Sequence, residues 1–249
     1  MPGMLSGGFP AAVLAGGAGT RLRSVVSDRP KVLVPVNGRP FLLILLDQLI
    51  AGGADRVVLC TGYLGDQIRE TVGDRYLGCP IVYSHEDQPL GTGGALRQAL
   101  RHAEGGVWMV ANGDSYAATP LGEFVSWYGP GERNGALLLT HVDDAARFGT
   151  VEVDDAGRVL GFREKQGLAV PAWINAGVYV LPKSRIEKLR EHVFLSLERD
   201  VFPGWADEGL AAYCVNAPFI DIGTPESLER AANFFGSAAG SAVASILYG

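Results

Sequence analysis

A glycine-rich loop near the N-terminus has the composition of a phosphate-binding segment. It reads Leu14-Ala15-Gly16-Gly17-Ala18-Gly19-Thr20-Arg21-Leu22, and Pro30-Lys31 follows it. Glycines let the backbone turn sharply and approach a phosphate without a Cβ atom in the way, and consecutive N–H groups can surround anionic oxygens. Arg21 offers a planar fork of donors to phosphate oxygens, and Lys31 offers a mobile point charge. A tight strand-to-helix turn with surface cations is the alternative that the loop alone leaves open.

The loop matches neither of two common nucleotide-binding signatures. The Walker A pattern Gly-x-x-x-x-Gly-Lys-Ser/Thr is absent. The dinucleotide-binding fingerprint is absent too, because Gly16-Gly17-x-Gly19 has the wrong spacing and no acidic residue ends the second predicted strand.

A second glycine-rich segment, Glu86–Ala95, lies between a predicted strand and a predicted helix. Free backbone N–H groups at a helix entry can bind a ligand, and glycines let a flat ligand come close. Taken alone, the segment is equally compatible with a structural helix N-terminus that follows a flexible turn.

A carboxylate follows the predicted strand Val107–Ala111, in the sequence Asn112-Gly113-Asp114. Ligands of parallel sheets bind at the carboxyl ends of the strands, and a carboxylate there is costly to bury without a cation or donors. Asp114 is therefore a candidate binding residue. A helix N-cap is the alternative.

These segments need a sheet that presents them at the ends of its strands. Apolar, β-rich runs alternate with helical patterns, which predicts βαβ units and a mostly parallel sheet covered on both faces. The predicted strands are Phe9–Ala15, Arg56–Cys60, Ile81–Ser84, Val107–Ala111 and Ala136–Thr140. The predicted helices are Pro40–Ile50, Asp66–Val72, Gly94–Ala103 and Leu121–Trp127.

After about Gly149 the pattern changes to a mixed α+β lobe that completes the same sheet. A hairpin is predicted from Thr150–Val153 and Arg158–Phe162 with a Gly-containing turn between them. The further strands are Trp173–Leu181 and Leu210–Asn216, and the helices are Ser184–Arg190, Leu197–Phe202 and Pro225–Phe235, the last with Thr224 as N-cap. We expect a flexible leader over residues 1–9, one domain over 10–235 and a small-residue-rich tail over 236–249.

Composition and charge exclude several classes of protein. Hydrophobic residues make up 47% of the 249 residues, enough for a substantial core. The net charge of −6 argues against a general nucleic-acid binder, and no apolar run reaches the ~20 residues that span a bilayer. The start shows no secretory signal, and the three cysteines are scattered. We therefore expect a cytoplasmic protein without nucleic-acid or membrane partners, and the four histidines, which lack metal spacing, as surface or structural residues.

The motif Gly-Gly-x-Gly-Thr-Arg-Leu, followed by Pro30-Lys31 and Val34-Pro35-Val36, resembles the signature of the sugar-nucleotide pyrophosphorylases. That family usually has a proline soon after the Arg-Leu pair, where this chain has Arg23-Ser24-Val25. The variant is most similar to the D-glycero-D-manno-heptose 1-phosphate guanylyltransferases, and the resemblance covers residues 10–235. It implies a Rossmann-like, three-layer α/β/α nucleotidyltransferase fold of the glycosyltransferase-A-like kind, with a mixed, mostly parallel sheet.

The resemblance also implies a reaction. A nucleoside monophosphate would pass from an NTP to a sugar 1-phosphate with release of pyrophosphate, with Mg²⁺ as cofactor and with GTP and D-glycero-D-manno-heptose 1-phosphate as the expected substrates. Glucose or mannose 1-phosphate with UTP, dTTP, CTP or GTP is an alternative, and a non-catalytic subunit that senses nucleotide sugars is an alternative of another class. A homo-oligomer is left open.

Site residues follow from the same resemblance. It assigns catalysis to Arg21 and Lys31, and magnesium to Asp114 and Asp221, although an N-cap role competes for Asp221 because Thr224-Pro225 follows it. The nucleotide-binding residues would be Leu14, Ala15, Gly16, Gly17, Gly19, Thr20, Gln88, Gly93 and Gly94. The residues that bind the sugar phosphate would be Gly149, Glu164, Lys165 and Asn175.

Overall fold

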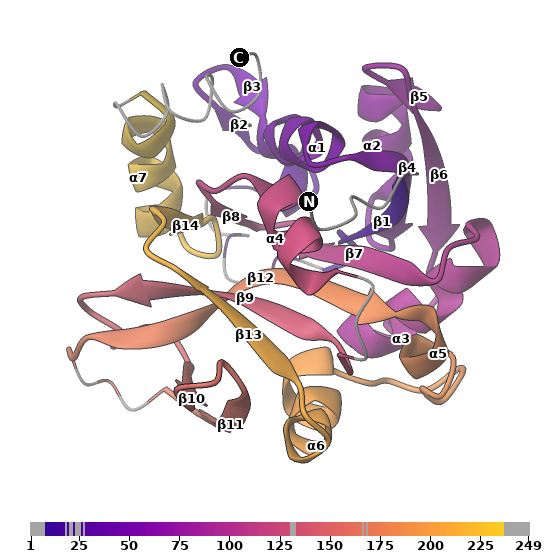
Figure 1. The fold of residues 1–249 in the computed structure, drawn as a ribbon. Coiled ribbons are helices and arrows are strands. Elements are labelled where there is room, and N and C mark those ends of the chain that lie inside the picture. Colours follow the sequence, from indigo (N-terminus) through magenta and orange to yellow (C-terminus); the bar gives the residue numbers. More distant parts are fainter. Residues whose placement is uncertain are drawn as a thin grey trace.

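The structure, a computed structural model, describes residues 8–17, 19, 22, 26, 28–129, 133–165, 167 and 169–236 (Figure 1). The predicted site residues Thr20 and Arg21 lie outside the described residues. Residues 237–249 of the predicted tail lie outside them too. Gly236, the first residue of that predicted tail, is the last residue of helix α7 (Pro225–Gly236).

A ten-stranded mixed sheet carries the fold, with four parallel strands at its centre. In order across the sheet these are β7 (Val107–Asn112), β1 (Phe9–Leu14), β4 (Ala54–Thr61) and β6 (Cys79–His85). Strand β1 begins at Phe9, one residue before the predicted domain boundary, and Phe9 is buried. The predicted mixed sheet with parallel strands is confirmed.

Each face of the sheet has its own hydrophobic core, because successive side chains of a strand point to opposite faces. Ala11 and Val13 belong to one core and Ala12 to the other, and all three are fully buried. The first core is covered by α1 (Phe41–Ala51), α2 (Gly65–Val72), α4 (Leu121–Tyr128) and α7. The second is covered by α3 (Gly91–Ala99), η3 (Leu100–His102), α5 (Lys183–Ile186) and α6 (Phe202–Asp207). The fold is therefore the predicted three-layer α/β/α arrangement.

The second half of the chain extends the same sheet. Strand β12 (Ala172–Pro182) runs antiparallel to β7, and β9 (Ala136–Val142) pairs with β12 and with the parallel strand β13 (Ala211–Val215). The predicted hairpin is present as β10 (Thr150–Val153) and β11 (Val159–Arg163). Its turn is held by Asp154, whose Oδ1 accepts hydrogen bonds from the N–H groups of Ala156 at 3.0 Å and Arg158 at 2.8 Å.

Several short strands were not predicted, since two or three residues are too few to show an alternating pattern. They are β2 (Pro35–Val36) with β3 (Arg39–Pro40), β5 (Arg75–Tyr76) beside β6, and β8 (Ser115–Ala117) with β14 (Phe219–Asp221). The pair β8–β14 matters most here, because it joins two segments that both carry candidate site residues.

Three helix predictions differ from the structure. Helix α3 begins at Gly91, three residues before the predicted start, and α5 ends at Ile186 where a helix to Arg190 was predicted. The predicted helix Leu197–Phe202 is a π-helical turn, η4 (Leu197–Val201), that leads into α6. Pro203 in the first turn of α6 has no N–H to donate, so one helical ladder cannot run through both.

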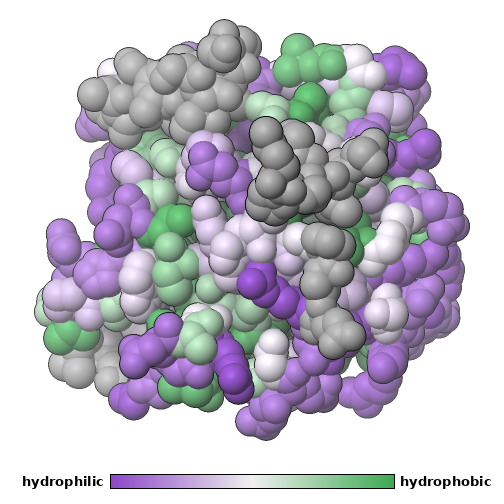
Figure 2. All heavy atoms as spheres, in the orientation of Figure 1, coloured by the Kyte–Doolittle hydropathy of each residue, from purple (hydrophilic) through white to green (hydrophobic). Residues whose placement is uncertain are grey.

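None of the helices in the described part of the chain is long and apolar enough to cross a membrane. On the face shown in Figure 2, apolar side chains are scattered among polar ones. The large apolar side chains that are exposed include Tyr63 and Phe194, and both of these line the cavity described next.

Candidate nucleotide-binding and catalytic site

A cavity of about 770 Å³ opens at the carboxyl ends of the four central strands. Leu14 ends β1, Gly62 follows β4, His85 ends β6 and Asn112 ends β7, and all four line it. Ligand sites in open α/β sheets lie at this edge. The other lining residues are Ala15, Gly16, Gly17, Gly19, Lys31, Val32, Tyr63, Glu86, Asp87, Pro89, Gly91, Thr92, Ala95, Asp114, Phe194 and Gly223.

The glycine-rich loop forms one wall of the cavity. A Cβ atom on Gly16 would stand 2.5 Å from Oε1 of Glu86, and one on Gly62 would stand 3.1 Å from the carbonyl oxygen of Gly16. Gly17 has nothing within 4 Å of its Cβ position, and Gly19 has a φ of +58°. The loop therefore packs closely against the ends of β4 and β6 while its middle faces open space.

Lys31 brings a positive charge into the cavity wall. It begins the 3-10 turn η2 (Lys31–Leu33), and its Nζ donates to Oδ2 of Asp114 at 2.5 Å. The Lys31 side chain is 12% exposed and that of Asp114 is 37% exposed. Burial would raise the pKa of the Asp114 carboxyl, but the Lys31 ammonium and the Ser115 hydroxyl outweigh it and hold that pKa below its usual range. Asp114 is thus a carboxylate held ionised at the end of β7.

The second predicted metal ligand, Asp221, is carried to the same place by strand β14. Asp221 lies opposite Ser115 in the β8–β14 pair, and the N–H of Ile222 donates to the carbonyl oxygen of Asp114 at 2.9 Å. A Cβ atom on Gly223 would stand 2.7 Å from Oδ1 of Asp221 and 3.5 Å from Nζ of Lys31. A side chain at position 223 would therefore clash with the Asp221 carboxylate and contact the Lys31 ammonium.

Helix capping does not account for these two carboxylates. No helix follows Asp114, since strand β8 begins at the next residue. Helix α7 is capped by Thr224, whose Oγ1 accepts from the N–H of Ser227 at 3.3 Å, as the sequence predicted. Asp221 supports the turn before that helix, where its Oδ1 accepts from the N–H of Gly223 at 2.8 Å, and its other carboxylate oxygen is not used in that turn.

The donor set at this point fits magnesium. Two carboxylates offer hard oxygen ligands, and Mg²⁺ is usually held by one or two carboxylates together with phosphate oxygens and water. Within the described ranges, no group of three or more His, Cys, Asp or Glu side chains is placed to hold a metal by itself. Asp114 and Asp221 would therefore hold Mg²⁺ together with a phosphate-bearing substrate.

The cavity wall beside the glycine-rich loop holds a residue that the sequence did not nominate. Glu86 follows β6, its Oε2 accepts from the N–H of Leu90 at 2.7 Å, and its side chain lines the cavity. Burial raises the pKa of its carboxyl above the usual range, against the opposing effect of that hydrogen bond. Its place directly after a predicted parallel strand was the signal that could have identified it.

The other nucleotide-binding residues predicted in this segment lie differently. The Gln88 side chain is exposed, while Gly93 and Gly94 are buried in the first turn of α3, and none of the three lines the cavity. The N–H of Gly93 donates to the carbonyl oxygen of Leu195 at 2.7 Å. Their neighbours Gly91 and Thr92 form this part of the wall instead.

The predicted sugar-phosphate residues form two groups. Gly149 stands at the end of the β10–β11 hairpin beside Arg163, next to the exposed residues Glu164 and Lys165, and these three predicted residues do not line the cavity. Asn175 lies on β12, half-buried, where its Oδ1 accepts from the N–H of Gly177 at 2.9 Å.

Comparison with known proteins agrees with this geometry. Residues 11–237 match the model of the nucleotidyl transferase family. The chain is 35% identical to the D-glycero-alpha-D-manno-heptose 1-phosphate guanylyltransferase of Campylobacter jejuni, covering 87% of this chain and 95% of that one. It is also 35% identical to the mannose-1-phosphate guanylyltransferase of Mycobacterium tuberculosis, covering 88% of this chain but 62% of that one.

Solved structures give the same result. The crystal structure of HddC from Yersinia pseudotuberculosis complexed with GMP-PN matches with a TM-score of 0.81 and 34% identity, covering 91% of this chain and 99% of that one. The fold, the cavity at the strand ends and the matched sequence agree, and the chain belongs to the nucleotidyl transferase family.

Proposed function

We propose that this protein transfers GMP from GTP to D-glycero-D-manno-heptose 1-phosphate, forming the GDP-sugar and pyrophosphate. The observation that carries the proposal is the ion pair of Lys31 and Asp114, which line one cavity with the glycine-rich loop, while strand β14 places Asp221 opposite Ser115, the neighbour of Asp114. A cation and two carboxylates at the strand ends suit a triphosphate with its metal. The family assignment supports the same reaction class. We infer a cytoplasmic location, which the sequence also predicts.

In this reaction a phosphate oxygen of the acceptor attacks the α-phosphorus of GTP. The bond from that oxygen to the α-phosphorus forms, the bond from the α-phosphorus to the α–β bridging oxygen breaks, and pyrophosphate leaves with the electron pair. Both reactants are anions, so positioning and charge neutralisation supply most of the acceleration. Lys31 contributes a fixed positive charge at the cavity wall, and Arg21 is expected from the sequence to contribute another.

Asp114 and Asp221 are the residues that would hold Mg²⁺. When bound, the ion supplies Lewis-acid polarisation of a phosphoryl oxygen. The chain's own part is to keep Asp114 ionised through Lys31 and to hold the Asp221 carboxylate beside it through strand β14.

The choice of guanine as the nucleobase follows from the position of Glu86. An ionised carboxylate only accepts hydrogen bonds, and guanine offers two adjacent donors, N1–H and the 2-amino group, along one edge. Adenine places an acceptor, N1, beside its amino group, so a carboxylate there faces a lone pair. Oε1 of Glu86, the oxygen that Leu90 does not bind, lies at the cavity wall next to Gly16. A carboxylate so placed favours guanine over the other bases.

Mannose 1-phosphate is the second candidate acceptor, because the mycobacterial mannose-1-phosphate guanylyltransferase has the same identity of 35%. The heptose phosphate is the first candidate because two heptose 1-phosphate guanylyltransferases are 35% and 36% identical to this chain, and because the segment Arg23-Ser24-Val25 resembles that group.

A panel of substrates tests the proposal. Pyrophosphate release is measured for each of the four common NTPs and dTTP against heptose, mannose and glucose 1-phosphates in the presence of Mg²⁺. We expect the highest kcat/KM for GTP with D-glycero-D-manno-heptose 1-phosphate. A far higher value for UTP or dTTP with glucose 1-phosphate would overturn the substrates but leave the reaction, and no release with any pair would overturn the reaction.

A further inference from the structure

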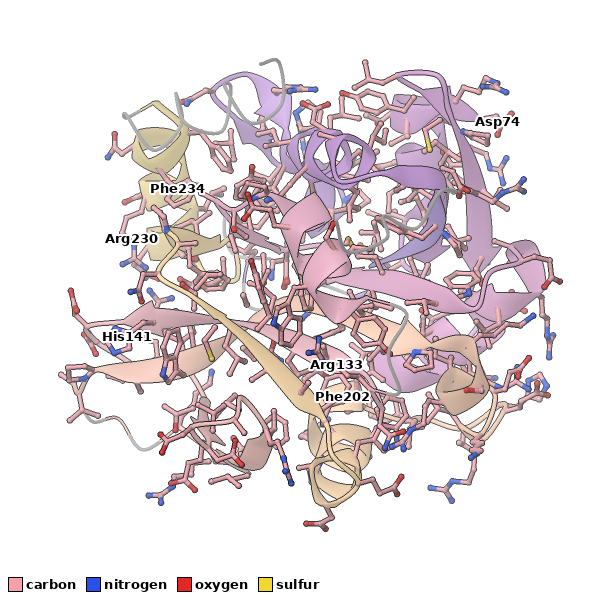
Figure 3. The ribbon with its side chains drawn as sticks, viewed as in Figure 1. Asp74, Arg133, His141, Phe202, Arg230 and Phe234 are labelled. Atoms are coloured by element: carbon pink, nitrogen blue, oxygen red, sulfur yellow. The ribbon has the colours of Figure 1, made fainter. Side chains whose placement is uncertain are left out.

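A buried hydrogen-bond network joins strands β7 and β12 to the turn η4 and includes Asn112, which lines the cavity. Its centre is Tyr179 of β12, which is fully buried. The Tyr179 ring packs against Phe202 at 4.9 Å between ring centroids, and Figure 3 shows Phe202 at the start of α6, beneath the sheet. Its hydroxyl contacts three polar side chains: Glu198, Asn175 and Asn112.

The direction of each hydrogen bond follows from Glu198. A carboxylate has no proton to give, so the Tyr179 hydroxyl donates to Oε1 of Glu198 at 3.2 Å. Burial and the Glu198 carboxylate raise the pKa of this tyrosine well above its usual value, so the hydroxyl keeps its proton. Because its one hydrogen is committed, the Tyr179 oxygen only accepts from Asn175 Nδ2 at 3.0 Å and from Asn112 Nδ2 at 3.4 Å.

Both asparagine amides are therefore oriented with the carbonyl oxygen away from Tyr179. For Asn175 that oxygen is satisfied by the N–H of Gly177. For Asn112 the oxygen Oδ1 is buried and has no hydrogen-bond partner in the described part of the chain. Gly177, with a φ of +74°, closes one side of Asn112, since a Cβ there would stand 3.1 Å from Nδ2. A buried acceptor without a partner is unfavourable, and Asn112 lines the cavity.

The order of the strands indicates which of the two substrates lies near the carbonyl oxygen of Asn112. Across the sheet the order is β12, β7, β1, β4, β6. Glu86, the proposed contact to the base, follows β6, and the glycine-rich loop follows β1. Asn112 on β7 and Asn175 on β12 lie on the other side of β1, away from the base. The sugar expected on this side is therefore that of the sugar 1-phosphate, and not the ribose of GTP.

We propose that Glu198 is a positioning residue for the acceptor: through Tyr179 it fixes the amide of Asn112, whose carbonyl oxygen then accepts a hydrogen bond from a hydroxyl of the sugar 1-phosphate. This rests on the proposed function for the identity of the acceptor. The orientation of the amides rests on the contacts alone.

A deoxy-sugar series tests the proposal. The kcat/KM is measured for the sugar 1-phosphate and for analogues that each lack one hydroxyl, with the wild type and with Asn112→Ala, Tyr179→Phe and Glu198→Leu, the last of which has no oxygen to accept from Tyr179. In the wild type we expect one analogue to be used about 10-fold less well, the worth of one ordinary hydrogen bond. In all three variants that penalty should shrink to about 2-fold or less, with the KM for GTP nearly unchanged.

Ser196→Ala is the matched control. Ser196 donates to Oε2 of the same Glu198 carboxylate at 3.0 Å but takes no part in the Tyr179 contacts, so this variant should lose thermal stability while it keeps the deoxy penalty. A penalty that persists in Asn112→Ala overturns the proposal. The proposal is also wrong if the variants lose discrimination against 2′-deoxy-GTP and not against the deoxy analogue of the sugar 1-phosphate. A penalty that disappears equally in Ser196→Ala overturns it too.

A measurement without substrate separates this inference from the proposed function. The unfolding free energies of Glu198→Leu, Tyr179→Phe and the double variant form a cycle. Because both changes break one chain of hydrogen bonds, their effects should be clearly less than additive, and strict additivity would contradict the relay. A wild type that uses no sugar 1-phosphate would overturn the proposed function and the acceptor with it, whereas this cycle would still decide the orientation.

Discussion

Asp114 and Asp221 are chemically alike but electrostatically different. Lys31 forms an ion pair with Asp114, and Ser115 donates to the other oxygen of that carboxylate, whereas Asp221 accepts from the N–H of Gly223 and the hydroxyl of Ser227. The Lys31 ammonium therefore compensates one carboxylate directly. Magnesium that binds both would share Asp114 with Lys31, which favours binding only when phosphate oxygens add further ligands.

We predict that Asp114→Asn and Asp221→Asn each lower kcat by about 100-fold or more and raise the magnesium midpoint, because each removes a full charge from the metal site. The melting temperature should distinguish the two variants. Asp114→Asn leaves the mostly buried Lys31 without its partner and should lower the melting temperature, while Asp221→Asn should change it little. The measurements are a magnesium titration at saturating substrates and a thermal melt, with the exposed Asp66→Asn as control. A wild-type midpoint and kcat in either variant would show that its carboxylate does not hold the metal.

Glu86 is the residue proposed to recognise guanine, and replacing it tests that role. Glu86→Gln should lower kcat/KM for GTP by about 10- to 100-fold, because a site built to accept from guanine then presents a mismatched group. The preference for GTP over ITP, which lacks the 2-amino group, should fall with it. The KM for GTP in the wild type should rise as the pH falls through the raised pKa of Glu86, since the protonated acid accepts less well, and the variant should lack this rise.

The control for that experiment is Glu70→Gln, the same change at an exposed position of α2. It should behave as the wild type with both nucleotides. If Glu86→Gln kept the full GTP-to-ITP preference, the base would be read by other groups, and Gln88, the residue that the resemblance nominates, would be the next to test.

At the scale of elements, the start of helix α3 depends on one glycine. Gly91 has a φ of +70°, and a Cβ there would stand 2.5 Å from the carbonyl oxygen of Leu195. Gly91→Ala should therefore lower the unfolding free energy by about 2–4 kcal/mol, through backbone strain and the clash together. Gly78 has a similar φ of +81° but open space around its Cβ position, so Gly78→Ala should cost only about 1 kcal/mol. Chemical denaturation measures both, and equal losses would show that the contact with Leu195 is unimportant.

Elements with a long apolar pattern were predictable and those held by distant partners were not. The central strands are buried on both faces, so their continuous apolar runs identify them. Strand β14 is three residues long and exists because it pairs with β8, more than a hundred residues earlier. No local pattern contains that partner.

The same distinction holds for the site. Lys31 and Asp114 were nominated from the sequence, but their ion pair joins positions 83 residues apart and only the fold shows it. Glu86 was missed because the resemblance directed attention to Gln88, while the direction of the side chains after β6 decides which one faces the cavity. The network around Tyr179 draws on strands β7 and β12 and on the turn η4, and its two asparagines are recognisable only once these elements are brought together.

For the whole molecule, the order of the strands gives the cavity a direction. The base would lie toward β6, the triphosphate over the loop after β1, and the acceptor toward β7 and β12. The second half of the chain supplies β12, β14 and the turn that carries Glu198. It would therefore complete the acceptor and metal sides of the proposed site, whose nucleotide side would come from the first half.

In the proposed reaction, the α-phosphate of GTP becomes bonded to the phosphate of the sugar 1-phosphate. The direct measurement supplies GTP labelled at the α-phosphate, D-glycero-D-manno-heptose 1-phosphate and Mg²⁺, and follows the label and the pyrophosphate together. We expect label in the GDP-sugar, unlabelled pyrophosphate in equal amount, and no turnover when the sugar 1-phosphate is left out. Label released as GMP or GDP at the same rate without the acceptor would contradict the proposed reaction.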